Sequence, residues 1–256
     1  MSALSRRLFL VFCTFGPLYF FTNGPILCAP PTTEEGAAMA AKVISVLNQK
    51  GGSSKTTTAT NLASCLAVKH GYKVLLVDLN HDQASATDWA ASRIEVEGDP
   101  GLIPVIAMGK NVARDLPRVS GGYDFVIIDG IPTVDETTAA SIKAADLALI
   151  PIQPSQYDIW ATVDLVQLVK DRRELTDGKP LARLLITRAV QGTRIERNAA
   201  EALEGFELPI MQTKTHHRVD YVEGVGQGLS VMDLPADNKA RLEIEAITDE
   251  LLEVLQ

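Results

Sequence analysis

Five short stretches of the chain are apolar at successive positions, and this pattern constrains the fold more than any other feature. A strand with one face in water alternates apolar and polar residues, so unbroken apolar runs indicate strands buried on both faces. Strands of that kind form parallel sheets that helices cover on either side. The five runs are residues 43–47, 74–77, 125–128, 147–152 and 184–186, and two weaker candidates are 103–107 and 209–212.

Helix-like stretches lie between these runs. The alternation predicts one α/β domain, a doubly wound, mostly parallel sheet with helices on both faces and right-handed crossover connections. In such a sheet a ligand binds beyond the carboxyl ends of the strands. The predicted helices are residues 55–70, 84–93, 135–145, 157–173, 194–205 and 235–255.

The loop after the first strand is the strongest chemical signal in the chain. Its glycines let backbone N–H groups face a phosphate, and the N-terminus of the following helix adds partial positive charge. Lys55 is then placed to reach the outer phosphates, and the hydroxyl of Thr56 to ligate Mg²⁺. The sequence therefore predicts a P-loop NTPase. Its phosphate-binding residues are Lys50, Gly51, Gly52, Ser53, Ser54, Lys55, Thr56 and Thr57.

The loop departs from the ordinary P-loop pattern at two positions. Ser54 stands where glycine usually precedes the lysine, and we expect its Cβ to crowd the loop and to weaken ATP binding or slow turnover. Lys50 is an additional lysine at the start of the loop, which fits a Lys-Gly-Gly-x-x-Lys-Thr variant.

Two aspartates follow hydrophobic strands, Asp78 after residues 74–77 and Asp129 after residues 125–128. A carboxylate beside a phosphate loop can hold Mg²⁺ or orient an attacking water. Alone, either aspartate would simply end a strand, but with the loop present we expect catalytic roles for both. The predicted metal residues are Thr56, Asp78 and Asp129.

With these motifs the chain resembles the ParA/MinD family of deviant Walker ATPases, and within it the ParF-like ParA-type partition proteins. The resemblance covers residues 42–256. It rests on the phosphate loop and on residues 83–89, 123–130, 151–158 and 185–188.

The resemblance implies dimerisation that depends on ATP and Mg²⁺, with two nucleotides held at the interface. Lys50 would cross to the partner's nucleotide, Asp78 would position the hydrolytic water, and Asp129 would be the Walker B acid. The adenine and ribose would be lined by Pro154, Asp158, Thr187 and Arg188. Hydrolysis is expected to be weak unless a partner stimulates it.

The segment after Asp78 differs from the family pattern by an apparent one-residue insertion. Residues 79–83 read Leu-Asn-His-Asp-Gln, which displaces the second acid to Asp82. His81 could act as a base or could be a solvated loop residue, and the family needs no histidine for hydrolysis.

The expected function is the partition of plasmid or chromosomal DNA, and the alternative is the positioning of a protein cargo, such as a carboxysome or a chemotaxis cluster, on the nucleoid. A MinD-type membrane ATPase is less favoured, because the stretch from Arg241 is acidic and lacks lysine. Iron–sulfur carriers of this fold need cysteines at the dimer axis, and residues 39–256 contain only Cys65.

Contact with DNA is expected to come from a local basic cluster. The 24 Lys and Arg residues are outnumbered by 32 Asp and Glu residues, a formal charge of −8, so the chain as a whole does not attract polyanions. The candidates are Arg194, Arg197, Lys214 and Arg218, which could equally form a solvated basic face. The expected partners are a second copy of the chain, nonspecific DNA and a small centromere-binding or cargo-adaptor protein, without stable membrane binding.

Residues 1–38 do not match the rest of the chain. Arg6 and Arg7 precede an apolar run over residues 8–21, as in a secretory signal, and the run is too short and interrupted for a membrane-spanning helix. A start codon placed too far upstream of Met39 would give the same prefix. We expect a signal-like or mis-assigned extension over 1–38, and a cytoplasmic, nucleoid-associated ATPase domain over 39–256.

Overall fold

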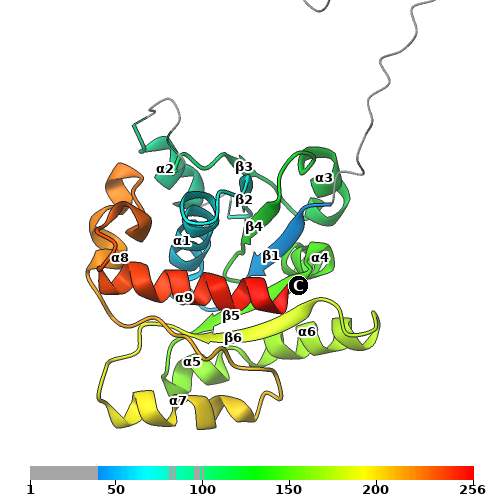
Figure 1. Ribbon diagram of the computed structural model, residues 1–256. Coiled ribbons are helices and arrows are strands. Elements are labelled where there is room, and N and C mark those ends of the chain that lie inside the picture. The colour runs from blue at the N-terminus through cyan, green and yellow to red at the C-terminus, as the bar shows by residue number, and fades with distance from the viewer. Residues whose placement is uncertain (1–39, 81–82, 84, 95–98, 100) are drawn as a thin grey trace, which may run out of the picture. The chain divides into compact units, whose positions relative to one another are not determined.

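The computed structural model describes residues 40–80, 83, 85–94, 99 and 101–256, and this part contains one six-stranded sheet (Figure 1). The strand order is β3-β2-β4-β1-β5-β6, and every neighbouring pair is parallel. The predicted α/β parallel sheet is therefore confirmed. The strands are β1 Lys42–Val46, β2 Val74–Asp78, β3 Val105–Ala107, β4 Phe125–Asp129, β5 Leu147–Ile152 and β6 Leu181–Ile186.

The chain divides after Ala37, and the fold described here belongs to the second unit, Ala38–Gln256. The predicted extension over residues 1–38 lies outside the described residues.

Helices cover both faces of the sheet (Figure 1). Helices α1, α2 and α9 share one hydrophobic core with one face, and α3, α4, α6 and α7 pack on the other. The helices are α1 Lys55–Val68, α2 Ser85–Ala91, α3 Val112–Val119, α4 Glu136–Ala144, α5 Gln156–Trp160, α6 Val163–Glu174, α7 Arg194–Glu204, α8 Asp220–Glu223 and α9 Lys239–Val254, with 3₁₀ turns η1 Val225–Gln227 and η2 Val231–Asp233.

The unbroken apolar runs are explained by the two covered faces. Ile44 and Ile127 enter the core beneath α1 and α9, whereas Val43 and Val126 point into the core on the opposite face. Successive side chains of a strand point to opposite faces, so a strand covered on both sides needs apolar residues at nearly every position.

Two predicted elements differ from the structure. The predicted strand over residues 209–212 is wrong, because only Ile210 pairs there, in an isolated bridge to Leu184. The predicted helix over residues 157–173 is two helices, α5 and α6. The hydroxyl of Thr162 donates to the carbonyl of Asp158 at 2.7 Å at this break, and the side-chain amide of Asn48 approaches the same hydroxyl at 3.4 Å.

The C-terminal helix α9 buries its apolar side in the core. Ile244, Ile247 and Leu251 are buried and belong to the core that α1 also enters. Asn238 caps the helix by accepting hydrogen bonds from the N–H groups of Ala240 and Arg241. In the part of the chain that the structure describes, each helix is too short or too polar to cross a bilayer.

Candidate nucleotide site

The loop between β1 and α1 is held by two side chains, Asn48 and Gln153. Asn48 accepts a hydrogen bond from the backbone N–H of Lys50 at 2.8 Å and donates to the carbonyl of Pro151 at 2.8 Å. Gln153 donates to the carbonyl of Gly52 at 2.7 Å. These contacts fasten the loop to the end of β5, and neither side chain had a predicted role.

The backbone of this loop turns through the left-handed region at two residues. Gly52 has φ 75° and Ser54 has φ 71°. Glycine adopts this region freely, but a residue with a Cβ is strained there by roughly 1–2 kcal/mol. The left-handed backbone at this position explains why glycine usually precedes the P-loop lysine. Ser54 has a Cβ and is therefore strained there.

We expect Ser54→Gly to raise the free energy of unfolding by about 0.5–1 kcal/mol. Relief of the left-handed strain gains roughly 1–2 kcal/mol, and the greater freedom of glycine in the unfolded chain takes back roughly 0.5–1 kcal/mol. Urea unfolding without nucleotide measures the change. Ser53→Gly is the matched control, since Ser53 lies outside the left-handed region and its substitution should destabilise the protein. A Ser54→Gly variant less stable than the parent chain would contradict the strain argument.

The predicted Mg²⁺ residues meet where α1 begins. The hydroxyl of Thr56 donates to Asp129 Oδ2 at 2.7 Å. Asp129 is only 1% exposed. Burial raises the pKa of Asp129 to about 7, and the charge of Asp78 acts in the same direction, against the Thr56 hydrogen bond and the charge of Lys55. Burial also lowers the pKa of Lys55, an effect that the Asp129 carboxylate partly offsets.

Asp78 lies next to Asp129 across the sheet. The parallel register of β2 and β4 pairs the two residues, and Asp78 is 2% exposed. Its Oδ1 accepts a hydrogen bond from the N–H of Asn80 at 2.9 Å. Its Oδ2 accepts from both the N–H and the hydroxyl of Thr87, each at 3.1 Å. The sequence-predicted acids are therefore together, and Asp78 has a fixed orientation.

Unpaired buried oxygens at this point fit a bound cation and phosphate. Among the described residues, Asp129 Oδ1 and Ser53 Oγ are buried without a hydrogen-bond partner. The described chain holds no group of three His, Cys, Asp or Glu side chains able to bind a metal by themselves. Mg²⁺ commonly binds through one or two protein oxygens together with substrate phosphates, and Thr56 with Asp129 supplies such a set.

Two cavities adjoin the loop and share Ser54, Thr57 and Arg188. One, of about 240 Å³, is lined by residues 51–57 together with Asn80, Gln83, Gly130, Pro132 and Arg188. The other, of about 290 Å³, extends from Thr57 and Arg188 to the segment 215–219. The first is lined by the phosphate loop itself, and the second adjoins it through the three shared residues.

The four residues predicted to line the adenine and ribose lie in different surroundings. Arg188 borders both cavities. Pro154 borders a third cavity, which Arg188 also lines. Thr187 is fully buried, and within the described chain its hydroxyl has no partner. Asp158 is buried and lines none of these three cavities.

Lys50, the lysine expected to reach a partner's nucleotide, is held within its own subunit. Its Nζ lies 2.9 Å from Asp158 Oδ2, with side-chain exposures of 38% and 6%. The hydroxyl of Ser155 also donates to Asp158. Helix α5, which carries Asp158, also exposes Tyr157 (75%) and Trp160 (62%), and their rings lie edge to face with the centroids 5.8 Å apart.

Comparison with known proteins identifies the family. A family model described as an AAA domain matches residues 41–111 and 90–179, more than half of the chain. A maintenance of carboxysome distribution protein A from Gloeobacter kilaueensis is 32% identical, over 82% of this chain and 94% of its own. The chain belongs to the ParA/MinD family of ATPases.

Two further comparisons agree with this ParA/MinD-family assignment. A maintenance of carboxysome distribution protein A from Halothiobacillus neapolitanus is 27% identical, over 84% of this chain and 99% of its own. The solved structure of a Cyanothece McdA variant with ATP has a TM-score of 0.69 at 19% identity, and covers 83% of this chain and 96% of that one. At this identity the structural likeness shows the shared fold.

The basic residues predicted to contact DNA in this ParA/MinD-family chain divide into two pairs. Lys214 lies 3.1 Å from Glu196, and Arg218 lies 2.6 Å from Glu243. Burial acts against ionisation of Glu243, but hydrogen bonds from Arg218 and from its other neighbours hold its pKa below the usual value. Lys214 and Arg218 therefore have acidic partners inside the protein. The other pair, Arg194 and Arg197, is exposed at the start of α7.

Cys65, the one cysteine of residues 39–256, is a core residue of α1. It is fully buried, and burial raises the pKa of its thiol to about 11.

Sequence reasoning missed the polar residues that orient the site. Gln153 and Thr87 lie in segments that carry the resemblance, Asn48 lies just before the phosphate loop, and Asn80 lies in the divergent segment after Asp78. None of the four had an assigned role of its own. Polar residues within motifs that otherwise bind phosphate were the available signal. His81 and Asp82, the residues of the apparent insertion, lie outside the described residues.

Proposed function

We propose that this protein is a ParA-type ATPase that binds ATP and Mg²⁺, dimerises, and positions a protein cargo along DNA. The observation that carries the proposal is the set of Thr56, Asp129 and Asp78 at the mouth of the phosphate loop. Thr56 is bonded to a fully buried Asp129 with a free oxygen, and the register places Asp78 beside it.

Different groups at this site are proposed to bind the phosphates, hold Mg²⁺ and orient the attacking water. Backbone N–H groups of the loop and the ammonium of Lys55 would bind the phosphates, and Thr56 with Asp129 would hold Mg²⁺. When bound, Mg²⁺ supplies charge neutralisation for the transferring phosphoryl group. Asp78, buried and oriented by Asn80 and Thr87, would hold the attacking water. Slow hydrolysis is proposed for the protein alone, because partner-supplied groups contribute roughly 10³–10⁵ in rate in other P-loop enzymes.

The cargo proposed here reverses the order expected from the sequence. Two relatives similar over at least 94% of their own length are named for carboxysome distribution, which favours a protein body over a DNA molecule as cargo. Plasmid or chromosome partition stays the second candidate. The neighbouring gene separates them: a disordered adaptor beside shell-protein genes supports a protein body, and a small ribbon–helix–helix protein supports DNA partition.

A MinD-type membrane ATPase is the weakest candidate. Attachment of that kind needs a basic amphipathic tail with a free apolar side. Here α9 places Ile244, Ile247 and Leu251 in the core, so its apolar side is not free to bind a membrane.

The proposal predicts that DNA binding requires ATP and weakens with salt. A dimer carries two copies of Arg194 and Arg197, so log affinity should fall against log salt with a slope of roughly −3 to −4. Salt titration with random-sequence duplex, with and without ATP, measures this slope. Arg194→Ala with Arg197→Ala should abolish retention and keep ATP binding. The matched control is Arg114→Ala with Arg118→Ala, two exposed arginines on α3.

Two outcomes of this titration would contradict the proposal. Binding that ignores salt would exclude an electrostatic contact with phosphates, and equal binding without nucleotide would exclude gating by ATP. Either result would favour a positioning system that does not use the nucleoid.

A further inference from the structure

The orientation of Asp78 depends on one residue of helix α2. Of the three hydrogen bonds that its carboxylate accepts, two come from Thr87, through its N–H and its hydroxyl, and the third from the N–H of Asn80. The N–H of Thr87 belongs to the first turn of α2, where backbone donors have no partner within the helix. Thr87 therefore fixes Oδ2 of Asp78 with both of its donors.

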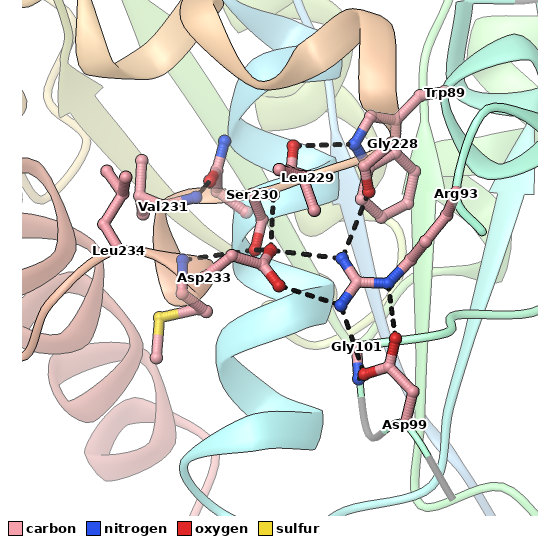
Figure 2. Close-up of polar contacts among 12 residues, drawn as sticks. Trp89, Arg93, Asp99, Gly101, Gly228, Leu229, Ser230, Val231, Asp233 and Leu234 are labelled. Carbon is pink, nitrogen blue, oxygen red and sulfur yellow. Dashed lines mark hydrogen bonds and ion pairs between the residues drawn. The ribbon is translucent and has the colours of Figure 1, made fainter. Parts of the chain in front are cut away.

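Helix α2 is fastened at its buried side. Ala86 and Trp89 are buried in the core that contains α1 and α9. The indole N–H of Trp89 donates to the carbonyl of Leu229 at 3.0 Å (Figure 2). The short helix thus rests on the segment that precedes η2, far away in the sequence.

Just after α2, Arg93 joins three backbone segments. Figure 2 shows its guanidinium between the carboxylates of Asp99 and Asp233. It makes five hydrogen bonds, two to Asp99, two to Asp233 and one to the carbonyl of Gly228. Guanidinium has five N–H donors, so every donor of Arg93 is used. Its side chain is 9% exposed.

Two glycines make room for this arginine. A Cβ on Gly228, which has φ 68°, would lie 2.4 Å from the backbone nitrogen of Arg93. A Cβ on Gly101 would lie 2.3 Å from its guanidinium. Gly228 packs against the backbone of Arg93 and Gly101 against its guanidinium, so both ends of the residue are held in place in addition to its hydrogen bonds.

The same segment is tied to the phosphate-loop helix. The N–H of Val231 donates to Asn61 Oδ1 at 2.8 Å, and the amide of Asn61 donates to the carbonyl of Thr57 at 2.7 Å. Helices α1 and α2 are therefore both fastened to residues 228–233. Residues 228–233 thus contact both the helix that carries Thr87 and the helix that follows the phosphate loop.

We infer that Thr87 is a positioning residue that aims Asp78, and that the Arg93 cluster, formed by Arg93, Asp99, Gly228 and Asp233, keeps Thr87 in place. The inference rests on the proposed function, because it assigns the orientation of the carboxylate on which hydrolysis depends. Thr87 lines neither of the two described cavities beside the phosphate loop, and both of its donors bond to Asp78, so its effect on hydrolysis is expected to pass through that carboxylate.

The test compares Thr87→Val with Thr87→Ser in the full chain. Valine keeps the shape and the N–H but loses the hydroxyl, so kcat for ATP hydrolysis should fall roughly tenfold. Losses of about this size follow the removal of a hydrogen-bond partner that orients a metal-coordinating side chain. KM for ATP should stay within about twofold. Serine keeps the hydroxyl and should restore most of the turnover. Thr176→Val is the matched control, a half-buried threonine at the opposite edge of the sheet, before β6.

A double-mutant cycle separates positioning from general stability. In an Asp78→Asn background Thr87→Val should cause little further loss, because residues that act as a unit are not additive. Arg93→Met should also lower kcat, and Thr87→Val should add less in that background than alone. If Arg93→Met does not fold, Asp233→Asn tests the cluster instead, because it keeps the shape of an acceptor of two Arg93 hydrogen bonds and removes its charge. A folded variant of either kind with unchanged kcat would overturn the role of the Arg93 cluster.

The outcomes are distinguishable. Unchanged kcat in Thr87→Val, a rise in KM alone, or full additivity with Asp78→Asn would overturn the positioning role and leave the ATPase proposal standing. Absence of hydrolysis by the parent chain would overturn both the proposed function and this inference.

Discussion

The Asp78→Ala variant is expected to hydrolyse ATP roughly 10²–10³-fold more slowly than the parent chain, the size of effect found when one transition-state contact is removed. A carboxylate that orients water acts on the transition state, so its loss lowers kcat and leaves ground-state binding of ATP unchanged. Single-turnover hydrolysis and nucleotide affinity measure the two quantities. The variant should also accumulate an ATP-bound dimer that stays on DNA.

The buried position of Asp78 calls for a second variant. Alanine leaves a space and three unsatisfied donors, the N–H of Asn80 and both the N–H and the hydroxyl of Thr87. Asp78→Asn fills the space, so a loss of turnover shared by both variants excludes a packing defect. Normal hydrolysis in both would place the catalytic acid elsewhere, with Asp82 as the first candidate.

The Lys50→Ala variant is expected to bind ATP and to remain monomeric. If Lys50 neutralises the partner's nucleotide, its removal breaks a buried charge pair and weakens dimerisation by about 3–5 kcal/mol. The dimer dissociation constant should then rise by more than about 10²-fold. Light scattering with and without ATP measures the assembly. Lys55→Ala is the contrasting variant, because it should lose the nucleotide itself.

The ion pair with Asp158 requires its own control. Lys50→Ala leaves a carboxylate that is 6% exposed without its lysine, which destabilises the monomer for a separate reason. Lys50→Ala with Asp158→Asn removes that unpaired charge. A double variant that dimerises with ATP would show that Lys50 has no role across the interface.

The sequence predicts the parts of this fold that depend on burial. Strands β1, β2, β4 and β5 are visible because a strand covered on both faces must be apolar throughout, and the acids stand out because they end such strands beside the phosphate loop. The helix α3 is not predicted, since Pro117 lies inside it and proline normally marks a helix boundary.

What the sequence does not predict depends on contacts between distant residues. At the break between α5 and α6, Thr162 contacts Asn48, which is more than a hundred residues earlier in the chain. Lys50 forms an ion pair within its own subunit because Asp158, in the segment after β5, lies close to the phosphate loop. Thr87 and Arg93 act through groups that neighbour them only in the folded chain. Pattern and propensity describe local preferences, so such pairings appear only once the sheet order is known.

The two tryptophans, with their opposite surroundings, give the protein two separate optical signals. Trp89 is 4% exposed and bonds to Leu229, whereas Trp160 is 62% exposed on α5, the helix that also carries Asp158. Iodide, which quenches only fluorophores that solvent reaches, will report on Trp160, and the emission that survives quenching will report on Trp89. In a Trp89→Phe variant the remaining emission of Trp160 reports whether the surface of α5 becomes covered. In a Trp160→Phe variant the remaining emission of Trp89 reports whether α2 loosens from the core.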